Sequence, residues 1–489
     1  MPSRAAPRRL LVAGIGLSFT AAFLSALTQV QGLIGPQGIA PAGAALRAAV
    51  TAWGPVRAGW AFPSVFWLGA SDRALQMVCV AGAVAGGLAV VGLAPRGALA
   101  VAWGLHVSLV AAGNVFWRFQ WDALLSEAGL LAVLVAPAGL RPAWARSPPR
   151  PVWLLLQLLL VRLMVASGAV KLLSGDLTWR NLTALRYHFW TQPLPTPVGI
   201  WLAHLPVGLL DVLCAISIGV ELVAPLCILG PRPVRRAGAL ALALLQLAIA
   251  LSGNYGFFNL LSLTLVVAML DDRDLGAACR LLLRGRRPSP PAPAGWEVRL
   301  GAGALALLGV AAFVQGLGGP APLAAVTYAL SPLDSLNGYG LFAVMTSERD
   351  EIRLQVSEDG ATWEPLRFRH KPDDRGASFV APAMPRLDWQ MWFAALGPCR
   401  ASPWFFPFAR RLLEGDPPVW QLLATGLPAT PPRYLRSVRR AVLPPARGQA
   451  WPQLAEAAEP FCPALALRNG RLVAVDVGPP GFEPGTNRL

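Results

Sequence analysis

Four ionisable side chains lie inside long apolar stretches of this sequence, and each is a candidate for chemistry. Arg162 and Glu221 lie near the middle of two consecutive apolar runs, so equal depth predicts that they form an ion pair. Lys171 lies about 13 Å farther along its helix, at the depth of Glu127 in a neighbouring run. Charges are costly in such surroundings and indicate function by default, although paired charges can also simply hold helices together.

Lys171 also has a sharper interpretation as an enzyme residue. A desolvated lysine amine can act as a base, and the enzymatic hypothesis places the reaction at Lys171 and His188. The sequence contains no His/Cys cluster, no Gly-rich phosphate loop and no Gly-x-Ser-x-Gly elbow to complete a catalytic set. We therefore expect a non-enzymatic protein without a metal or cofactor, and the Lys171 enzyme is the alternative.

The composition is that of a membrane protein. Only 14% of the 489 residues are charged and 55% are hydrophobic, whereas soluble domains carry about 25% charged residues. The net charge of +16 is carried almost entirely by arginines in short gaps between apolar runs. This distribution orients helices and contacts lipid headgroups. A nucleic-acid partner is not expected, because its site would be a basic stripe on a folded domain.

The elements that position these charges are membrane-spanning helices. A span takes about 20 apolar residues. The sequence contains about nine such runs, at 10–30, 75–94, 98–118, 122–140, 153–173, 208–230, 237–252, 255–270 and 298–317. Only Gly253-Asn254 separates the seventh run from the eighth, which predicts a tight hairpin or a partly re-entrant pair. The expected fold is a polytopic α-helical membrane bundle over residues 1–320, followed by a small β-rich extracytoplasmic domain.

The distribution of arginine predicts the orientation, because cytoplasmic loops are enriched in Lys and Arg. The basic N-terminus is placed in the cytoplasm, and alternating spans put the Arg-rich gaps 141–152, 231–236 and 271–297 on the same side. The long gap 31–74 is an exception, since it carries three arginines on the other side. Everything after about residue 318 is then extracytoplasmic.

The loops predicted to lie outside the cytoplasm share one kind of chemistry. They combine aromatic rings with amides, prolines and single charged groups. An ordinary interfacial belt explains the Trp and Tyr residues, but it does not explain the accompanying Asn, Gln and Pro. We expect a structured cap that binds a partner or an amphipathic ligand, with the candidate residues Trp121, Asp122, Tyr187, His188, Gln192, Asn254, Tyr255 and Asn259.

Residues 330–440 are expected to form the small β-rich domain. Apolar residues alternate over 352–356, a turn follows at 357–360, and a second apolar stretch ends at Phe368, which predicts a β-hairpin. A later helix carries an apolar face with i, i+3, i+4 and i+7 spacing, formed by Trp389, Trp392, Phe393 and Leu396. That face is either packed in the core or exposed to a partner protein.

The C-terminal tail, 441–489, is expected to be unstructured, because the preceding segment 436–445 is basic and ends in prolines. Cys399 and Cys462 could form a disulfide in an oxidising compartment. The six cysteines are otherwise too few and too scattered for a disulfide framework or a zinc site.

Several motifs occur in a specific order along the chain. They are Phe119-Gln-Trp-Asp, the stretch 167–197, Gly253-Asn-Tyr-Gly-Phe-Phe-Asn, Asn337-Gly-Tyr-Gly-Leu-Phe and Pro385-Arg-Leu-Asp-Trp-Gln-Met-Trp. These motifs resemble the signature segments of lipase maturation factors, from about residue 20 to 425. The match in the last motif adds Arg386, Asp388, Trp389 and Trp392 to the candidate binding residues. After Tyr434 the chain departs from the family pattern, which ends in a Tyr-rich strand.

This resemblance implies a multi-pass membrane protein that assists the maturation of secreted lipase-like client proteins and contacts membrane lipids. It implies residence in the endoplasmic reticulum membrane, or in the cytoplasmic membrane if the source is bacterial, as the Arg-, Ala- and Gly-rich composition suggests. A weaker resemblance, over one helix, links Ala169-Val-Lys-Leu to vitamin K-dependent carboxylase-like membrane domains. It supports the enzymatic alternative and implies a quinone-like or lipid substrate, acted on through Lys171.

Overall fold

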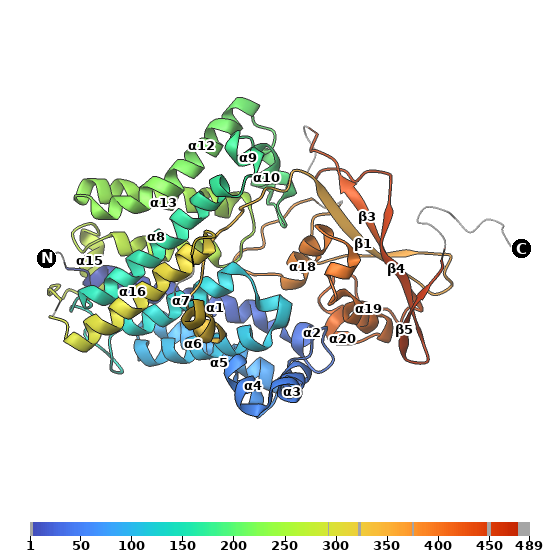
Figure 1. Cartoon of the computed structure of the whole chain (residues 1–489), viewed down its shortest axis with the longest axis horizontal. Helices are drawn as coiled ribbons and strands as arrows, with labels where there is room; N and C mark the ends of the chain where they lie inside the picture. The colour runs from blue at the N-terminus through green and yellow to red at the C-terminus, as the bar shows by residue number, and fades with distance from the viewer. Residues whose placement is uncertain (1–2, 292, 321–323, 374–375, 447–450, 478–489) are drawn as a thin grey trace, which may run out of the picture.

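Helices form one end of the molecule and a five-stranded sheet forms the other (Figure 1). The computed structural model describes residues 3–291, 293–320, 324–373, 376–446 and 451–477. The N-terminus lies at the end of the helical bundle that is farthest from the sheet, and α18 (Arg386–Ala395) lies between the bundle and the sheet (Figure 1).

Each of the nine predicted apolar runs lies on a helix. These helices are α1 (Ala5–Leu27), α5 (Asp72–Val91), α6 (Pro95–Ala112), α7 (Gln120–Val135), α8 (Arg150–Leu173), α12 (Val207–Val223), α13 (Arg232–Ser252), α14 (Phe258–Val266) and α16 (Trp296–Gly316). In the described chain, six helices are long and apolar enough to cross a membrane, whereas α7 and α14 have only 16 and 9 residues. The helical membrane bundle is confirmed in outline, and the count of nine spans remains a prediction.

The seventh run is longer than the sequence indicates, because its helix extends beyond the apolar residues. α13 begins at Arg232, whose Nε lies 2.6 Å from Asp274, while Arg235 Nη2 lies 2.6 Å from Asp271. These ion pairs neutralise the basic first turns of α13, so the helix reaches 21 residues. α14 remains short and continues as the 3-10 helix η4 (Val267–Met269).

α1 runs through the centre of the bundle. It packs against α5 at glycines, since a Cβ added at Gly16 would lie 2.7 Å from the carbonyl oxygen of Gly86. Small residues at such positions let two helix backbones approach closely. The Asp272 carboxylate accepts hydrogen bonds from the N–H groups of Ala5 and Ala6 at 3.1 and 2.7 Å. It therefore satisfies free backbone donors at the start of α1.

Short helices form the connections of the bundle. They are α2 (Val30–Ile34), α3 (Ala42–Trp53), α4 (Pro55–Ala61), η1 (Val65–Leu68), η2 (Asn114–Trp117), α9 (Leu177–Arg180), α10 (Leu185–Thr191), α11 (Pro197–Leu202), η3 (Ala224–Leu229), α15 (Ala277–Leu282), α17 (Ala324–Leu330) and η5 (Ser331–Leu333). α9 and α10 lie at the sheet end of the bundle, whereas α15 lies beside the N-terminus (Figure 1).

The C-terminal sheet is antiparallel, in the order β2-β1-β3-β4-β5. Its strands are β1 (Arg349–Ser357), β2 (Glu364–Leu366), β3 (Tyr434–Val442), β4 (Glu459–Arg468) and β5 (Arg471–Val475). The predicted hairpin is confirmed, because Leu354 of β1 lies opposite Leu366 of β2. The long strand β3 then pairs with β1 along its whole length, so the hairpin becomes one edge of a larger sheet.

The expectation of an unstructured tail over 441–489 is wrong for the residues that form β4 and β5. Phe461 and Leu465 of β4 are buried, and β4 pairs with β3. Prolines are rare inside strands because they cannot donate to the ladder, and Pro460 and Pro463 concealed this one in the sequence. The pairing with β3 is interrupted by register shifts around Ser437, and an irregular ladder of this kind tolerates prolines. Residues 478–489 lie outside the described residues.

Three helices cover the sheet on the side of the bundle: α18, α19 (Phe405–Glu414) and α20 (Pro417–Trp420). A disulfide between Cys399, in the 3-10 helix η6 (Cys399–Ala401), and Cys462 of β4 ties these helices to the sheet. The bond closes a loop with a sequence separation of 63 residues. Closing a loop of that length stabilises a fold by roughly 4 kcal/mol in the chain-entropy description.

The placement of loops at opposite ends of the bundle gives a test of orientation. We expect a membrane-impermeant thiol reagent to label Glu358→Cys, in the β1–β2 turn, in intact cells. Arg286→Cys, in the Arg-rich gap after α15, should react only after the membrane is permeabilised. Both native side chains are exposed, and the parent chain with its own cysteines is the control. Protection of Glu358→Cys in intact cells would contradict the predicted orientation.

Candidate functional site

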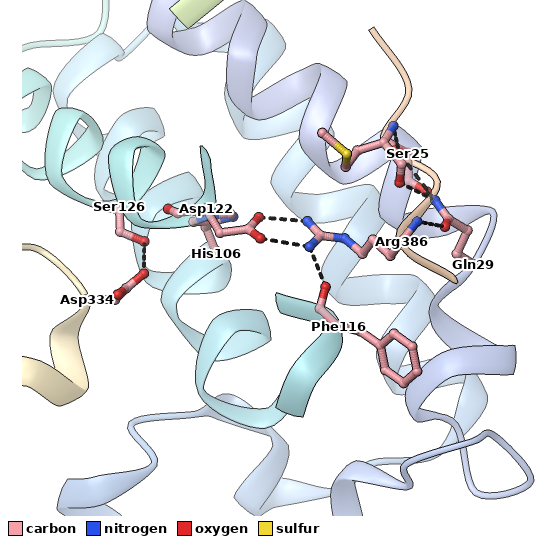
Figure 2. A network of polar contacts seen from close by, with 9 residues as sticks. Ser25, Gln29, His106, Phe116, Asp122, Ser126, Asp334 and Arg386 are labelled. Atoms are coloured by element: carbon pink, nitrogen blue, oxygen red, sulfur yellow. Dashed lines mark hydrogen bonds and ion pairs between the residues drawn. The ribbon is translucent and has the colours of Figure 1, made fainter. Parts of the chain in front are cut away.

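The C-terminal domain is joined to the bundle by a fully buried ion pair. Arg386, the first residue of α18, donates from Nη2 and Nη1 to the two carboxylate oxygens of Asp122 at 2.7 and 2.8 Å (Figure 2). Nη1 also donates to the carbonyl oxygen of Phe116 at 2.6 Å, and the guanidinium lies 4.2 Å from the centre of the Trp117 ring. Asp122 lies in the first turn of α7, where the helix dipole stabilises a negative charge.

The end of α1 binds the backbone that leads into α18. Ser25 accepts from the N–H of Met384 at 2.8 Å, and Gln29 accepts from the N–H of Arg386 at 2.8 Å (Figure 2). The Gln29 amide also donates to the carbonyl oxygen of Met384 at 2.9 Å. Side chains of the bundle therefore satisfy backbone groups of this segment that a neighbouring strand would otherwise satisfy.

A second polar group lies deeper along α7. Glu127 accepts from Arg162 Nη1 at 2.6 Å and from the Tyr339 hydroxyl at 2.7 Å, and Arg162 also donates to the carbonyl oxygen of Asn337. Residues 337 and 339 belong to the segment between α16 and β1, which thus enters the bundle between α7 and α8. A Cβ added at Gly309 of α16 would lie 2.6 Å from Arg162, so glycine makes room for the guanidinium.

The predicted pairing of the four intramembrane charges is wrong. Arg162 pairs with Glu127, and Lys171 pairs with Glu221, with Nζ 2.5 and 2.6 Å from the two carboxylate oxygens. The prediction assumed that the midpoints of α8 and α12 lie at the same depth in the membrane. Lys171 in the last turn of α8 instead meets Glu221 in the last turn of α12, so the two helices are staggered. Helix stagger depends on how the intervening loop packs, which residue counting does not show.

The loop candidates also converge at this interface. The Tyr255 hydroxyl donates to Gln192 Oε1 at 2.7 Å and lies 3.4 Å from His188 Nε2. Asn254 donates to the carbonyl oxygen of Ser378 at 2.8 Å and accepts from the N–H of Val380 at 2.7 Å. Burial and the nearby charge of Lys171 lower the pKa of His188 to about 4, so His188 is neutral at physiological pH.

The predicted apolar face of α18 has a buried edge, formed by its tryptophans, and an exposed edge. Trp389 packs against Trp121 of α7 with ring centres 4.7 Å apart, and Trp392 donates to the carbonyl oxygen of Thr191 at 2.9 Å. Both are buried, whereas Phe393 and Leu396 are 43% and 52% exposed. The face is therefore core along one edge and surface along the other.

Three candidates lie beside this interface and not within it. Asp388 accepts hydrogen bonds from the backbone N–H groups of His370 and Lys371, both at 2.9 Å, inside the C-terminal domain. Asn259 donates to Gln246 at 3.0 Å within the bundle. Tyr187 is half-buried and packs against two small hydrophobic clusters beside the loop helices.

Sequence reasoning missed a buried charge cluster in β1. Arg349 donates to the carbonyl oxygens of Pro193, at 3.1 Å, and of Gln192, and it pairs with Glu351. Lys371 lies 2.6 Å from the same Glu351 carboxylate. Burial alone would raise the pKa of Glu351, but Lys371 and Arg349 lower it to about 2. Arg349 and Glu351 share a strand face by period-two spacing, yet the same pattern is typical of a solvent-exposed face, so the signal was weak.

A cavity of about 370 Å³ lies at the centre of the interface. Its walls come from the bundle and from the C-terminal domain, and most of the lining is apolar. Its lining includes Arg118, Phe119, Trp121, Met164, Ser167, Glu221, Gln246, Tyr255, Phe258, Phe342, Val344, Trp389, Phe393 and Leu396. Among the described residues, no group of three or more His, Cys, Asp or Glu side chains could hold a metal ion.

This fold and interface define a class: a multi-span helical membrane protein whose C-terminal sheet domain is fixed to the end of the bundle by buried charge. Residues 6–277 match the family described as the Lipase maturation factor transmembrane domain, and residues 335–440 match the Lipase maturation factor C-terminal domain. The chain belongs to the lipase maturation factor family.

Individual relatives extend over most of both chains. Lipase maturation factor 2 of Homo sapiens is 33% identical over 94% of this chain and 83% of its own length. The Rattus norvegicus protein of the same name is 32% identical over 90% and 80%, and Lipase maturation factor 1 of Homo sapiens is 30% identical over 88% and 81%. No solved structure matches the chain significantly.

The buried Asp122–Arg386 pair predicts a large stability effect. Asp122→Asn leaves the Arg386 charge buried without a carboxylate, which typically costs about 3–5 kcal/mol. We expect a marked fall in the thermal unfolding temperature of the purified full-length protein and early proteolytic release of the C-terminal domain. Asp122→Leu combined with Arg386→Leu should recover most of that loss, because no charge remains buried.

The matched control is Arg410→Gln. It removes the exposed Arg410–Glu414 pair on α19, and such pairs contribute about 0.3–0.5 kcal/mol. If Asp122→Asn behaved like this control, the ion pair would not be what holds the domain in place.

Asp334 predicts a pH dependence of stability. Burial, reinforced by the neighbouring Asp122 carboxylate, raises its pKa to about 7. The folded state therefore holds a proton that the unfolded state loses near pH 4, and stability falls as the pH rises from about 4 to about 7. Asp334→Asn keeps the hydrogen bond to Ser126 and tolerates the left-handed backbone (φ 48°) at this position. Unfolding temperatures across this pH range should then flatten, and an unchanged slope would contradict the assignment.

Proposed function

We propose that this chain is a non-enzymatic, membrane-resident maturation factor that assists the folding or assembly of secreted lipase-like proteins. It matches proteins named Lipase maturation factor over 80% or more of their length, in both the membrane and the C-terminal segments. One structural observation carries the proposal further. The C-terminal domain is held rigidly against the bundle, yet it leaves apolar side chains exposed at the junction.

The proposed client surface is the exposed edge of α18 and the neighbouring loop. Phe393 and Leu396 are about half exposed, and Val344 is 68% exposed. Exposed apolar groups of this kind mark interaction sites. Because the bidentate Arg386–Asp122 pair lies at the start of the same helix, this surface is presented at a fixed position relative to the membrane.

The proposed location is the endoplasmic reticulum membrane, with the N-terminus in the cytoplasm and the C-terminal domain in the lumen. In a bacterial cell the corresponding places are the cytoplasmic membrane and the periplasm. Two observations support this orientation: the arginine-rich gaps that lie on the side of the N-terminus, and the Cys399–Cys462 disulfide, because such bonds persist in oxidising compartments.

The enzymatic alternative at Lys171 and His188 has less support from the geometry. Both carboxylate oxygens of Glu221 accept from Lys171 Nζ, so the amine is held in an ion pair and is not free to act as a base. His188, whose pKa of about 4 makes it a weak base near pH 7, contacts the Tyr255 hydroxyl.

The client proposal predicts a separation between folding of the factor and its function. We expect Phe393→Asp combined with Leu396→Asp to leave the factor stable and membrane-inserted. In cells that lack their own factor, the variant should lower the activity of a co-expressed secreted lipase several-fold per mole of lipase synthesised, and it should recover less lipase on pull-down of the full chain.

Leu427→Asp provides the control, since Leu427 is similarly exposed (51%) but lies away from the junction in the C-terminal domain. Lipase activity that is unchanged by the α18 variant, or reduced equally by Leu427→Asp, would contradict this client surface.

A further inference from the structure

We propose that the cavity between the bundle and α18 binds one acyl chain of an anionic phospholipid, with the headgroup at Arg118. Its volume of about 370 Å³ is in the range of about 300–1,000 Å³ that is usual for small-molecule sites. Its deep wall is formed by bundle side chains such as Leu163, Met164 and Phe258, all buried. The cavity shares Phe393, Leu396 and Val344 with the proposed client surface, but the lipid test below does not rely on lipase activity.

Two tryptophans that line the cavity carry indole N–H groups without an acceptor. Trp121 Nε1 and Trp389 Nε1 are buried, and neither has a hydrogen-bond partner within the described part of the chain. By contrast, Trp153 donates to the carbonyl oxygen of Ala268 and Trp392 to that of Thr191, although the buried Trp451 Nε1, away from the cavity, also lacks a partner. Unpaired buried donors are rare and require an explanation. Neither nitrogen is open to the cavity in this structure, so a small rotation of each ring on binding would let the ester carbonyl of an acyl chain supply the missing acceptors.

The charges around the cavity set the orientation of the ligand. Arg118 is exposed at the rim, and no carboxylate lies within ion-pairing distance of it among the residues that the structure describes. At the deep end, Glu221 is paired with Lys171, and Gln246 and Ser167 are bonded to other protein groups. An anionic headgroup is therefore attracted to the rim and gains nothing at the deep end, so the hydrocarbon chain points inward.

The same lining disfavours a peptide as the occupant. Every residue of a peptide brings a backbone donor and acceptor that must be satisfied when buried, whereas most of this wall is apolar and its unpaired buried side-chain groups are the two indole donors. Met164 of α8 and Ile249 of α13 line the cavity from apolar helices that are long enough to cross a membrane. The cavity is therefore lined in part by helices whose neighbours in a membrane are lipid acyl chains.

The test is lipid retention by the full-length protein, measured by native mass spectrometry after exchange into detergent. Dioleoyl phosphatidylglycerol, dioleoyl phosphatidylcholine and oleic acid are added separately. We expect one tightly bound phosphatidylglycerol per chain, with at least tenfold weaker binding of the other two. Arg118→Gln should remove most of the difference in affinity between the two phospholipids. Arg57→Gln, which replaces an exposed arginine that does not line the cavity, should leave that difference unchanged.

Two cavity-filling variants guard against a folding artefact. Met164→Trp fills the deep end, and Ala343→Trp fills the half-exposed rim, where a larger side chain is easier to accommodate. Either variant that keeps its unfolding temperature should lose the tightly bound phosphatidylglycerol. Retention of that lipid by a folded filling variant would show that it binds elsewhere and overturn the proposal. Equal phospholipid selectivity in Arg118→Gln and the parent, or preferred binding of oleic acid, would overturn it as well.

Discussion

The position of the C-terminal domain depends on the ion pair between Asp122 and Arg386. Both side chains are almost completely excluded from solvent, so separating them would leave two uncompensated charges in a low-dielectric interior. The surrounding groups are arranged to prevent this: the carbonyl oxygen of Phe116 accepts a further guanidinium hydrogen, and the Trp117 ring covers the face of the cation. Because Arg386 is the first residue of α18, the pair fixes the position at which that helix begins.

The short helix α7 carries most of the polar contacts on which this arrangement depends. Asp122, Ser126 and Glu127 each bind a segment from a different part of the chain: α18, the turn after α17, and the pair formed by α8 and Tyr339. With 16 residues, α7 is also shorter than a normal membrane span. The polar groups of Asp122, Ser126 and Glu127 are satisfied by other parts of the protein, which makes the helix a structural centre and not merely a weak span.

Sequence patterns predicted which residues belong to the interface better than they predicted its contacts. The arginine distribution placed the aromatic and amide loops on one side of the bundle, and Asp122, Gln192, Asn254, Tyr255 and Trp389 do meet there. The partner of each charge was not predictable, because helix stagger is set by packing of the long loop before α12. The strand β4 was hidden by its prolines, and the Arg349–Glu351 pair was hidden by a spacing that surface strands also have.

The contacts at the two ends of α1 limit how early the bundle can finish folding during synthesis. Its first turn is satisfied by Asp272, and Ser25 in its last turn, with Gln29 just beyond it, binds the backbone at residues 384–386. During synthesis α1 emerges first, but both groups that finish it are made much later. The bundle therefore cannot reach its final packing until most of the chain has left the ribosome. A protein interrupted before α18 has Asp272 at the start of α1 but lacks the backbone groups that bind Ser25 and Gln29 at the other end.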